Sequence, residues 1–272
     1  METTLNNAQK QSRLYSTFYR NGPSHRDGAD VTFGDIVKIF GFRTASVGQW
    51  VTKQEQQIAA NLFFDALCDL MAILGVPEQV ISLNGTLSIA FGKGGQKHSS
   101  AHYSATTRTL ALAKNAGAGS LSHEWFHAFD HFISTRFLKA ATPKDFASTL
   151  WLDRHDVVEH PLNGLLESCF QHIFLQPNSD KLSTLFVRSV AADKSLGSYY
   201  YALPPEVCAR AFEAFIQDHQ YKNAFLVQGT KQTAEAQIGL YPQGEQRQLI
   251  GEYFSQYFAT LGYALDKSSA RG

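Results

Sequence analysis

The chain has 272 residues, of which 44% are hydrophobic and 18% are charged. These values are typical of a globular protein with one large or two small domains and a substantial core. Lysine plus arginine equals aspartate plus glutamate, at 24 each, and this balance argues against bulk binding to nucleic acid or to an anionic membrane surface.

The N-terminal residues and the cysteines indicate in which cellular compartment the protein is expected. METTLNNAQKQSRL is polar and lacks the apolar segment of a secretory signal. No later apolar run approaches the ~20 residues of a membrane span. The cysteines Cys68, Cys169 and Cys208 are few and odd in number, which is typical of reduced core thiols. We therefore expect a cytoplasmic protein with no membrane partner.

Residues 1–30 are expected to form a polar arm that ends in the turn-rich stretch NGPSHRDGAD. The next stretch, VTFGDIVKIFGF (31–42), has the apolar spacing of a helix. Residues 51–76 repeat leucine and isoleucine at mixed three- and four-residue steps, which predicts a long amphipathic helix. Gly75 and Pro77 are expected to end it.

Two stretches then alternate in polarity and are rich in small or β-branched residues, at 82–92 and 100–114. We interpret both as strands, the second folding back near Ala105–Thr107. The glycines of GKGGQ (92–96) do not match the phosphate-binding GxxxxGK[ST] pattern, so they predict a turn.

Helices dominate the remainder. After the flexible stretch NAGAGS, a helix is expected from about Leu121 with Ser120 or Ser122 as its cap. Further helices are expected at 164–174 and at 204–218, where two prolines occupy the first turn.

The domain organisation follows from these elements. No repeat or linker is evident, so we expect one α+β domain over residues 31–265. Its helical part covers 31–80 and its core covers 81–265, followed by a disordered tail over 266–272.

The chemistry is concentrated in SLSHEWFHAFDHFI (120–133). Residues four apart on a helix lie one turn above each other, so His123 and His127 can reach one ion. Glu124 projects beside that face, where it can take a proton from a metal-bound water without being a ligand. The His-Glu-x-x-His pattern is typical of zinc hydrolases.

The competing interpretation is a buried helix that carries histidines by chance. Trp125, Phe126 and Phe129 do make the helix apolar on its other faces, but buried polar groups need partners, and a metal is one. His131 continues the series, yet eight residues of helix rise about 12 Å, so it cannot join the same ion. The glycine and later histidine of metzincins are absent, because Ile133 and Asp130 occupy those positions.

The third ligand is therefore expected to be a glutamate on a later helix, as in gluzincins. We rank Glu206, at the start of the 204–218 helix, before Glu213 on the same face and Glu167 in LLESCF. Asp130 is a candidate to orient a ligand histidine, or else a simple surface acid. The loop HDVVEH (155–160) also carries ligand-type residues and is a minor alternative. The full set of candidate carboxylates comprises Glu159, Glu167, Glu206, Glu213 and Glu252.

Long stretches of the chain, from YRNGPSHRDGADVTF to LALAKNAGAGSLSHEWFHAFDH and on to ALPPEVCARAFEAF and YPQGEQRQ, resemble the CLCA-X family of bacterial zincin-like proteins. They are also similar to the LPD1 domain of large polyvalent proteins of phages and conjugative elements. The resemblance implies a zincin-like α+β fold, with a small, mostly antiparallel sheet packed on the HExxH helix.

A more distant resemblance links the chain to gluzincin proteases of the anthrax lethal factor type. It implies that Glu206 is the third zinc ligand and that Tyr199 lies near the zinc. LPD1-like sequences imply Tyr200 instead, and either hydroxyl could stabilise an oxyanion. SYYYAL could equally be a strand-like aromatic patch. In the HExGH pattern of these proteases, Phe126 replaces the small residue.

These observations together predict a zinc-dependent peptidase of the gluzincin type, with Zn²⁺ held by His123, His127 and Glu206. Glu124 would be the general base, Tyr199 or Tyr200 would assist, and Asp130 and Glu213 would support the ligands. A protein or peptide would be the substrate, added as a strand beside residues 100–113.

Two alternatives are kept. One is a non-catalytic zincin-like binding module that acts in mobile-element transfer or host defence. The other is nucleic-acid binding through scattered basic residues, which the neutral charge disfavours; these are Arg13, Arg20, Arg26, Lys93, Lys97 and Arg108.

Overall fold

A computed structural model of the chain describes residues 13–93, 101–113 and 119–269. Its helices and strands confirm the α+β class. In chain order they are η1 (Arg13–Tyr15), α1 (Phe33–Phe40), β1 (Ala45–Val47), α2 (Lys53–Leu74), α3 (Glu78–Ile81), β2 (Ser88–Phe91), β3 (Ala101–Ser104), β4 (Thr109–Leu112), α4 (Ser120–Phe137), α5 (Ala147–Leu152), α6 (Pro161–Phe174), α7 (Thr184–Leu196), α8 (Pro204–Asp218), α9 (Ala234–Gln237) and α10 (Gly244–Ser269).

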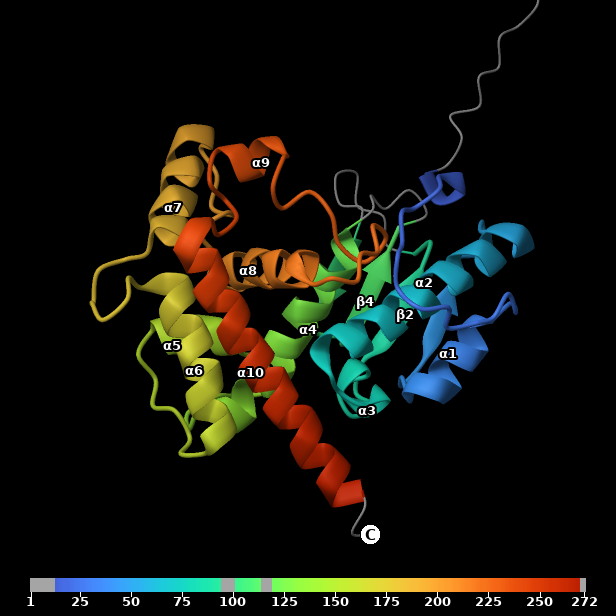
Figure 1. The fold of residues 1–272 in the computed structure, drawn as a ribbon, viewed down its shortest axis with the longest axis horizontal. Coiled ribbons are helices and arrows are strands. Elements are labelled where there is room, and N and C mark those ends of the chain that lie inside the picture. Colours follow the sequence, from blue (N-terminus) through green and yellow to red (C-terminus); the bar gives the residue numbers. More distant parts are fainter. Residues whose placement is uncertain (1–12, 94–100, 114–118, 270–272) are drawn as a thin grey trace, which may run out of the picture.

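Helix α4 lies between two groups of elements (Figure 1). The sheet and α1–α3 occupy one side, and α5–α10 occupy the other. Helix α4 packs against β3 and β4 on the first side and against α8 and α5 on the second. Helix α10 runs across α6 and α8. The HEWFH motif therefore lies on the element that joins the two halves of the core.

The sheet differs from the expected one. Its strand order is β1-β2-β4-β3, with β1–β2 and β2–β4 parallel and β3–β4 antiparallel. The sheet is therefore mixed rather than mostly antiparallel, because both β1 and β4 pair with β2 in the parallel sense. Antiparallel strands can be joined by a tight turn, and the expected fold-back between β3 and β4 is confirmed.

Helix starts and ends follow local rules. Thr32 and Thr52 each form a reciprocal capping box with an acid three residues later, and Gly41 and Gly75 end these helices in the left-handed conformation. Helix α8 begins at Pro204, as expected.

Some expected ends were wrong. The predicted cap at Ser120 or Ser122 is replaced by Gly119. The predicted disordered tail begins too early, since 266–269 form the last turn of α10.

Aromatic side chains fill the core around α4. The Trp125 ring stacks on Phe129 and Phe212, with ring centroids 5.7 and 5.5 Å apart. Its Nε1 donates a hydrogen bond to Ile81 O at 2.9 Å. Phe126 is fully buried, and its ring centroid lies 4.9 Å from that of Phe212. Its bulk therefore fills the interface between α4 and α8.

Helix α2 is long and apolar enough to cross a membrane, by length and composition alone. In the structure it is a core helix, because 61% of its most apolar window is buried within the domain. The three cysteines are buried and free.

The described part of the N-terminal arm is docked on α2 through Asp69. The Asp69 side chain is fully buried and accepts hydrogen bonds from Arg20 Nε at 2.6 Å and Asn223 Nδ2 at 2.8 Å. His25 Nε2 lies 2.8 Å from the same carboxylate. One carboxylate thus joins the arm, α2 and the loop after α8. Burial opposes ionisation of Asp69, but these partners outweigh it and hold its pKa below the usual range.

We predict that Asp69→Asn lowers the free energy of unfolding by roughly 3 kcal/mol at pH 7, as expected for a broken buried ion pair. Because the native pKa is depressed, this stabilisation is present above about pH 4, the unfolded value, and is lost as the pH falls further. Denaturant unfolding of wild type and variant at pH 7 and pH 3 measures both effects.

Asp65→Asn is the matched control, since Asp65 lies one turn away on α2 and pairs with Arg26 at a more exposed position. It should cost under about 1 kcal/mol. Equal losses in the two variants, or a difference at pH 3 as large as at pH 7, would contradict the role of Asp69.

Candidate metal and active site

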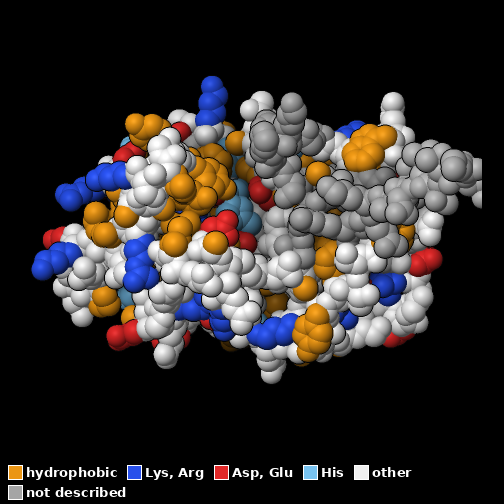
Figure 2. Space-filling view, turned by 90° about the horizontal axis from the view of Figure 1, so that it is seen from above, with side chains coloured by type: hydrophobic (Ala, Val, Ile, Leu, Met, Phe, Trp, Pro, Cys, Tyr) orange, Lys and Arg blue, Asp and Glu red, His pale blue; other side chains and the backbone are white. Residues whose placement is uncertain are grey.

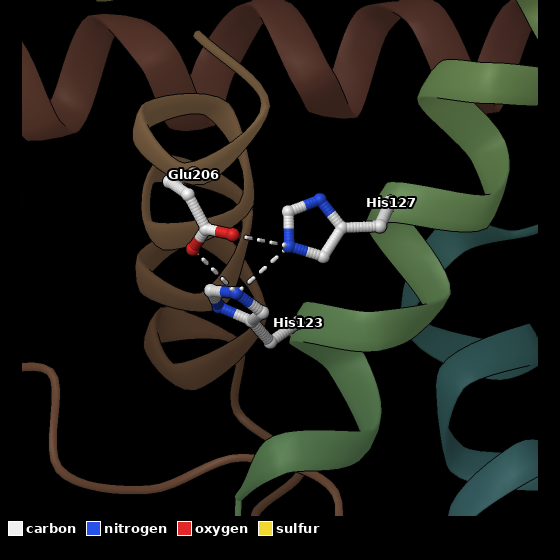
Figure 3. Close-up of side chains that lie close together, drawn as sticks. All are labelled: His123, His127 and Glu206. Carbon is white, nitrogen blue, oxygen red and sulfur yellow. Dashed lines mark hydrogen bonds and ion pairs between the residues drawn. The ribbon is translucent and has the colours of Figure 1, made fainter. Parts of the chain in front are cut away.

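Helices α4 and α8 bring the HEWFH histidines to Glu206 (Figure 3). The Nε2 atoms of His123 and His127 lie 3.0 Å apart. Glu206 Oε2 lies 3.2 Å from His123 Nε2, and Glu206 Oε1 lies 3.2 Å from His127 Nε2. Two donors that each bind one tetrahedral zinc at about 2.0–2.1 Å are separated by roughly 3.3 Å. The three side chains therefore have the separations of one ion's ligands.

Among the described residues, these three form the group of His, Cys, Asp or Glu side chains whose ligand atoms lie within 4.8 Å of one another. Their side chains are 11–14% exposed, so the site is partly shielded from water and still reachable. Two imidazoles with one carboxylate are donors that suit Zn²⁺. The donor set fits the expected metal.

Loop 225–228 fixes the start of α4. The N–H of Gly119 donates to Phe225 O, and the N–H of Ser122 donates to Leu226 O. Gly119 has a φ of +98°, and a Cβ atom there would lie 2.7 Å from Gln228 N. Glycine is therefore required at position 119, where the start of α4 approaches the 225–228 loop closely. This approach sets how deep His123 lies in the site.

Glu213 supports His123 from the side opposite to Glu206. It lies about two turns after Glu206 on α8, is buried, and places Oε2 3.0 Å from His123 Nδ1. A proton on Nδ1 leaves Nε2 free to bind a metal. Burial lowers the pKa of His123, but the carboxylates of Glu213 and Glu206 outweigh burial and raise it to about 10. The carboxylate pair thus makes this position strongly favourable for a cation.

Glu206 itself is held in the ionised form. Burial opposes its charge, while hydrogen bonds from His123 and His127 lower its pKa. Tyr241 also hydrogen-bonds the Glu213 carboxylate, and this contact adds to burial in raising the tyrosine pKa.

Glu124 lies beside the three donors, as the pattern predicted. Its side chain is 8% exposed and is not one of the clustered donors. Burial raises its pKa, and the nearby histidines and a hydrogen bond from the Tyr103 backbone on β3 oppose that rise. A carboxylate with a raised pKa in a cleft is a stronger base than a solvated one and is suited to accept a proton.

The two tyrosines proposed for the site have different positions. Tyr199 is 93% exposed and points into solvent. Tyr200 lines a cleft of about 480 Å³ together with His123, Glu124, Glu213 and Tyr241. Burial raises its pKa, and the nearby charge of the Glu206 carboxylate adds to that rise. Of the two, the structure brings Tyr200 to the histidines.

Asp130 is fully buried on α4, one turn after His127. It accepts hydrogen bonds from the backbone N and Oγ of Ser148, at 2.8 and 2.6 Å. It therefore joins α4 to the start of α5, and its burial raises its pKa to about 6. The other candidates lie elsewhere. The His131 ring bonds the Tyr103 hydroxyl and the Pro143 carbonyl oxygen. HDVVEH (155–160) lies in the loop before α6.

Sequence reasoning missed Asp193, in the last turn of α7. Its carboxylate accepts three hydrogen bonds, from the backbone N–H groups of Tyr200, Tyr201 and Ala202, at 3.0, 2.9 and 2.8 Å. Arg210 on α8 donates to the carbonyl of Tyr201 from the other side. The loop that leads into Glu206 is thus clamped at both faces. The helix dipole disfavours an acid near a helix C-terminus. The position of Asp193 in the sequence could therefore have indicated that its carboxylate has hydrogen-bond partners.

Two of the expected basic residues are already paired. Arg20 and Arg26 neutralise Asp69 and Asp65. Lys97 lies outside the described residues, as does the side chain of Arg13. These pairings leave less free charge for the nucleic-acid alternative.

Comparison with known proteins relates the C-terminal part of this chain to one family. The family model for large polyvalent protein-associated domain 1 (LPD1) matches residues 192–265. That range includes Asp193, Tyr200, Glu206 and Glu213, but not the HEWFH helix. No curated protein and no solved structure matches the chain. The similarity to LPD1 is therefore confirmed over the helices that supply the carboxylates of the site.

Proposed function

We propose that this protein is a zinc-dependent peptidase of the gluzincin type, which hydrolyses peptide bonds of a protein or peptide substrate. The convergence of His123, His127 and Glu206 from two helices carries the proposal. A metal would explain why three partly buried polar side chains meet at 3.0–3.2 Å.

The residues around the donors suit the roles that hydrolysis requires. Bound zinc would supply a Lewis acid that activates water and polarises the substrate carbonyl. Glu124 would take the proton of the attacking water and later return it to the leaving amine. Tyr200 would donate its hydroxyl hydrogen to the oxyanion that develops on the carbonyl oxygen. Glu213 would keep His123 in the tautomer that binds through Nε2.

The position of the edge strand β3 suits an extended substrate. Strand β3 is the last in the sheet order and packs on α4. A polypeptide that added beside it would run past Glu124, whose carboxylate accepts a hydrogen bond from the Tyr103 backbone.

A non-catalytic binding module is the alternative, favoured by the LPD1 match, since that description names an associated domain rather than an activity. The presence of Glu124 beside the donors favours catalysis, because a structural metal needs no base.

Elemental analysis of the purified chain should give close to one zinc ion per molecule. His123→Ala and Glu206→Ala should both lose the ion while keeping their helical circular dichroism, because each removes one of three donors. His155→Ala, in the HDVVEH loop, is the control and should retain it. A folded wild type that takes up no zinc, even when zinc is supplied, would overturn the metal site.

Glu124→Gln should bind zinc like the wild type and lose hydrolysis of an unstructured protein substrate by about 10²–10⁴-fold, the range for a removed general base. Zinc content and cleavage rate are measured on the same preparation. Activity that is unchanged in Glu124→Gln would exclude the proposed mechanism and indicate a contaminating peptidase. Zinc binding with no cleavage in either protein would favour the binding module.

Glu213→Gln should weaken zinc binding by about 10–100-fold, as loss of a carboxylate partner of a ligand histidine does. Competition with a chromogenic chelator measures this affinity. Glu252→Gln is the matched control, since Glu252 lies on α10, outside the residues that line the cleft. Equal zinc affinity in wild type and Glu213→Gln would remove Glu213 from the site.

A further inference from the structure

Large apolar side chains are exposed together between residues 196 and 203, directly before α8. Leu196 is 62% exposed and Tyr199 is 93% exposed, while Tyr200 and Leu203 are each 47% exposed. Single exposed apolar residues are common on protein surfaces, but a contiguous group indicates an interaction site. We call Leu196, Tyr199, Tyr200 and Leu203 the 196–203 platform.

The platform is held in place by buried polar contacts. Asp193, only 8% exposed, accepts hydrogen bonds from the three backbone N–H groups of residues 200–202. Arg210, only 4% exposed, also donates to Leu240 O, and its Cζ lies 5.7 Å from the centre of the Tyr201 ring. The exposed side chains are therefore presented by a fixed backbone, which lowers the entropy lost when a partner binds.

The platform continues into the candidate active site. Tyr200 lines the cleft together with His123 and Glu124, and Leu203 is the N-cap of α8, three residues before Glu206. Figure 2 shows hydrophobic side chains gathered beside a histidine and carboxylates in a hollow of the surface. A chain that reached the zinc ligands from this side would cross the platform first.

The chemistry of the platform selects one kind of partner. The segment LGSYYYAL has no charged side chain, so it offers no cation to neutralise a phosphate backbone. Tyrosines supply a large contact area at low entropic cost and are enriched at protein interfaces. Tyr199 projects outward rather than lining a cavity, so the surface suits a side chain of a passing polypeptide better than an enclosed small molecule.

We propose that the 196–203 platform binds a large aliphatic or aromatic side chain of the polypeptide substrate, close to the scissile bond. This inference rests on the proposed peptidase function and names the substrate class for that site. Asp193 positions the platform by accepting hydrogen bonds from the backbone N–H groups of residues 200–202.

The test uses the full chain with Glu124→Gln, loaded with zinc, so that binding is measured without turnover. Two fluorescent peptide pools of equal length and net charge are compared by anisotropy. One pool has Phe or Leu at a fixed position and the other has Ser there. The variants are Tyr199→Ser and Leu203→Ser. Tyr263→Ser is the matched control, because Tyr263 is 62% exposed near the C-terminal end of α10.

The Phe/Leu pool should bind at least about fivefold more tightly than the Ser pool, and Tyr199→Ser or Leu203→Ser should reduce that preference by about fivefold. Tyr263→Ser should leave the affinity within about twofold. Since Tyr199 is almost fully exposed, its substitution should preserve the fold, which circular dichroism checks.

Equal affinity for the two pools, or no peptide binding, would overturn the platform. A loss of affinity in Tyr263→Ser as large as in Tyr199→Ser would do the same. Zinc content and cleavage that depends on Glu124 test the proposed function separately. A chain that lacked zinc but kept the Tyr199-dependent preference would support the platform and overturn the peptidase.

Discussion

The packing of α4 against α8 holds the donor atoms of the site together. Phe212 on α8 contacts both Trp125 and Phe126 on α4, and these rings are fully buried. The apolar contact brings the first turns of the two helices into register, so that His123 and His127 face Glu206. Three polar side chains would otherwise separate to solvate themselves, and the burial of aromatic surface offsets that tendency.

The arrangement of charge around His123 follows from this packing. Its ring lies between Glu206 at Nε2 and Glu213 at Nδ1. Tyr241 bonds the Glu213 carboxylate. The carboxylates favour a cation at the ring, which is why its pKa is raised despite burial. A divalent ion at the Nε2 side would occupy a site that already favours positive charge, and Glu213 would remain as the partner of the Nδ1 proton.

The loop between α7 and α8 links this charge arrangement to the molecular surface. Asp193 and Arg210 fix the loop from opposite faces, so the positions of Tyr200 and Glu206 are coupled through a short, rigid segment. The LPD1 match covers these elements but not α4. Asp193 and the carboxylates of α8 therefore lie within the matched residues, whereas the histidines lie outside them.

The sequence by itself determined the HEWFH helix, the α8 helix with Glu206 in its first turn, and the β3–β4 hairpin, because helical spacing, prolines and polar alternation are local signals. It also ranked Glu206 above Glu213 and Glu167, and the distances agree with Glu206 as the partner of both histidines. Only the tertiary structure decided that β1 and β2 pair in parallel, that Asp130 bonds Ser148, and that Tyr200 rather than Tyr199 faces the cleft. Those outcomes depend on residues distant in the chain meeting in space, or, for the tyrosines, on the loop conformation held by the hydrogen bonds from residues 200–202 to Asp193. A pattern of neighbouring residues does not contain that information.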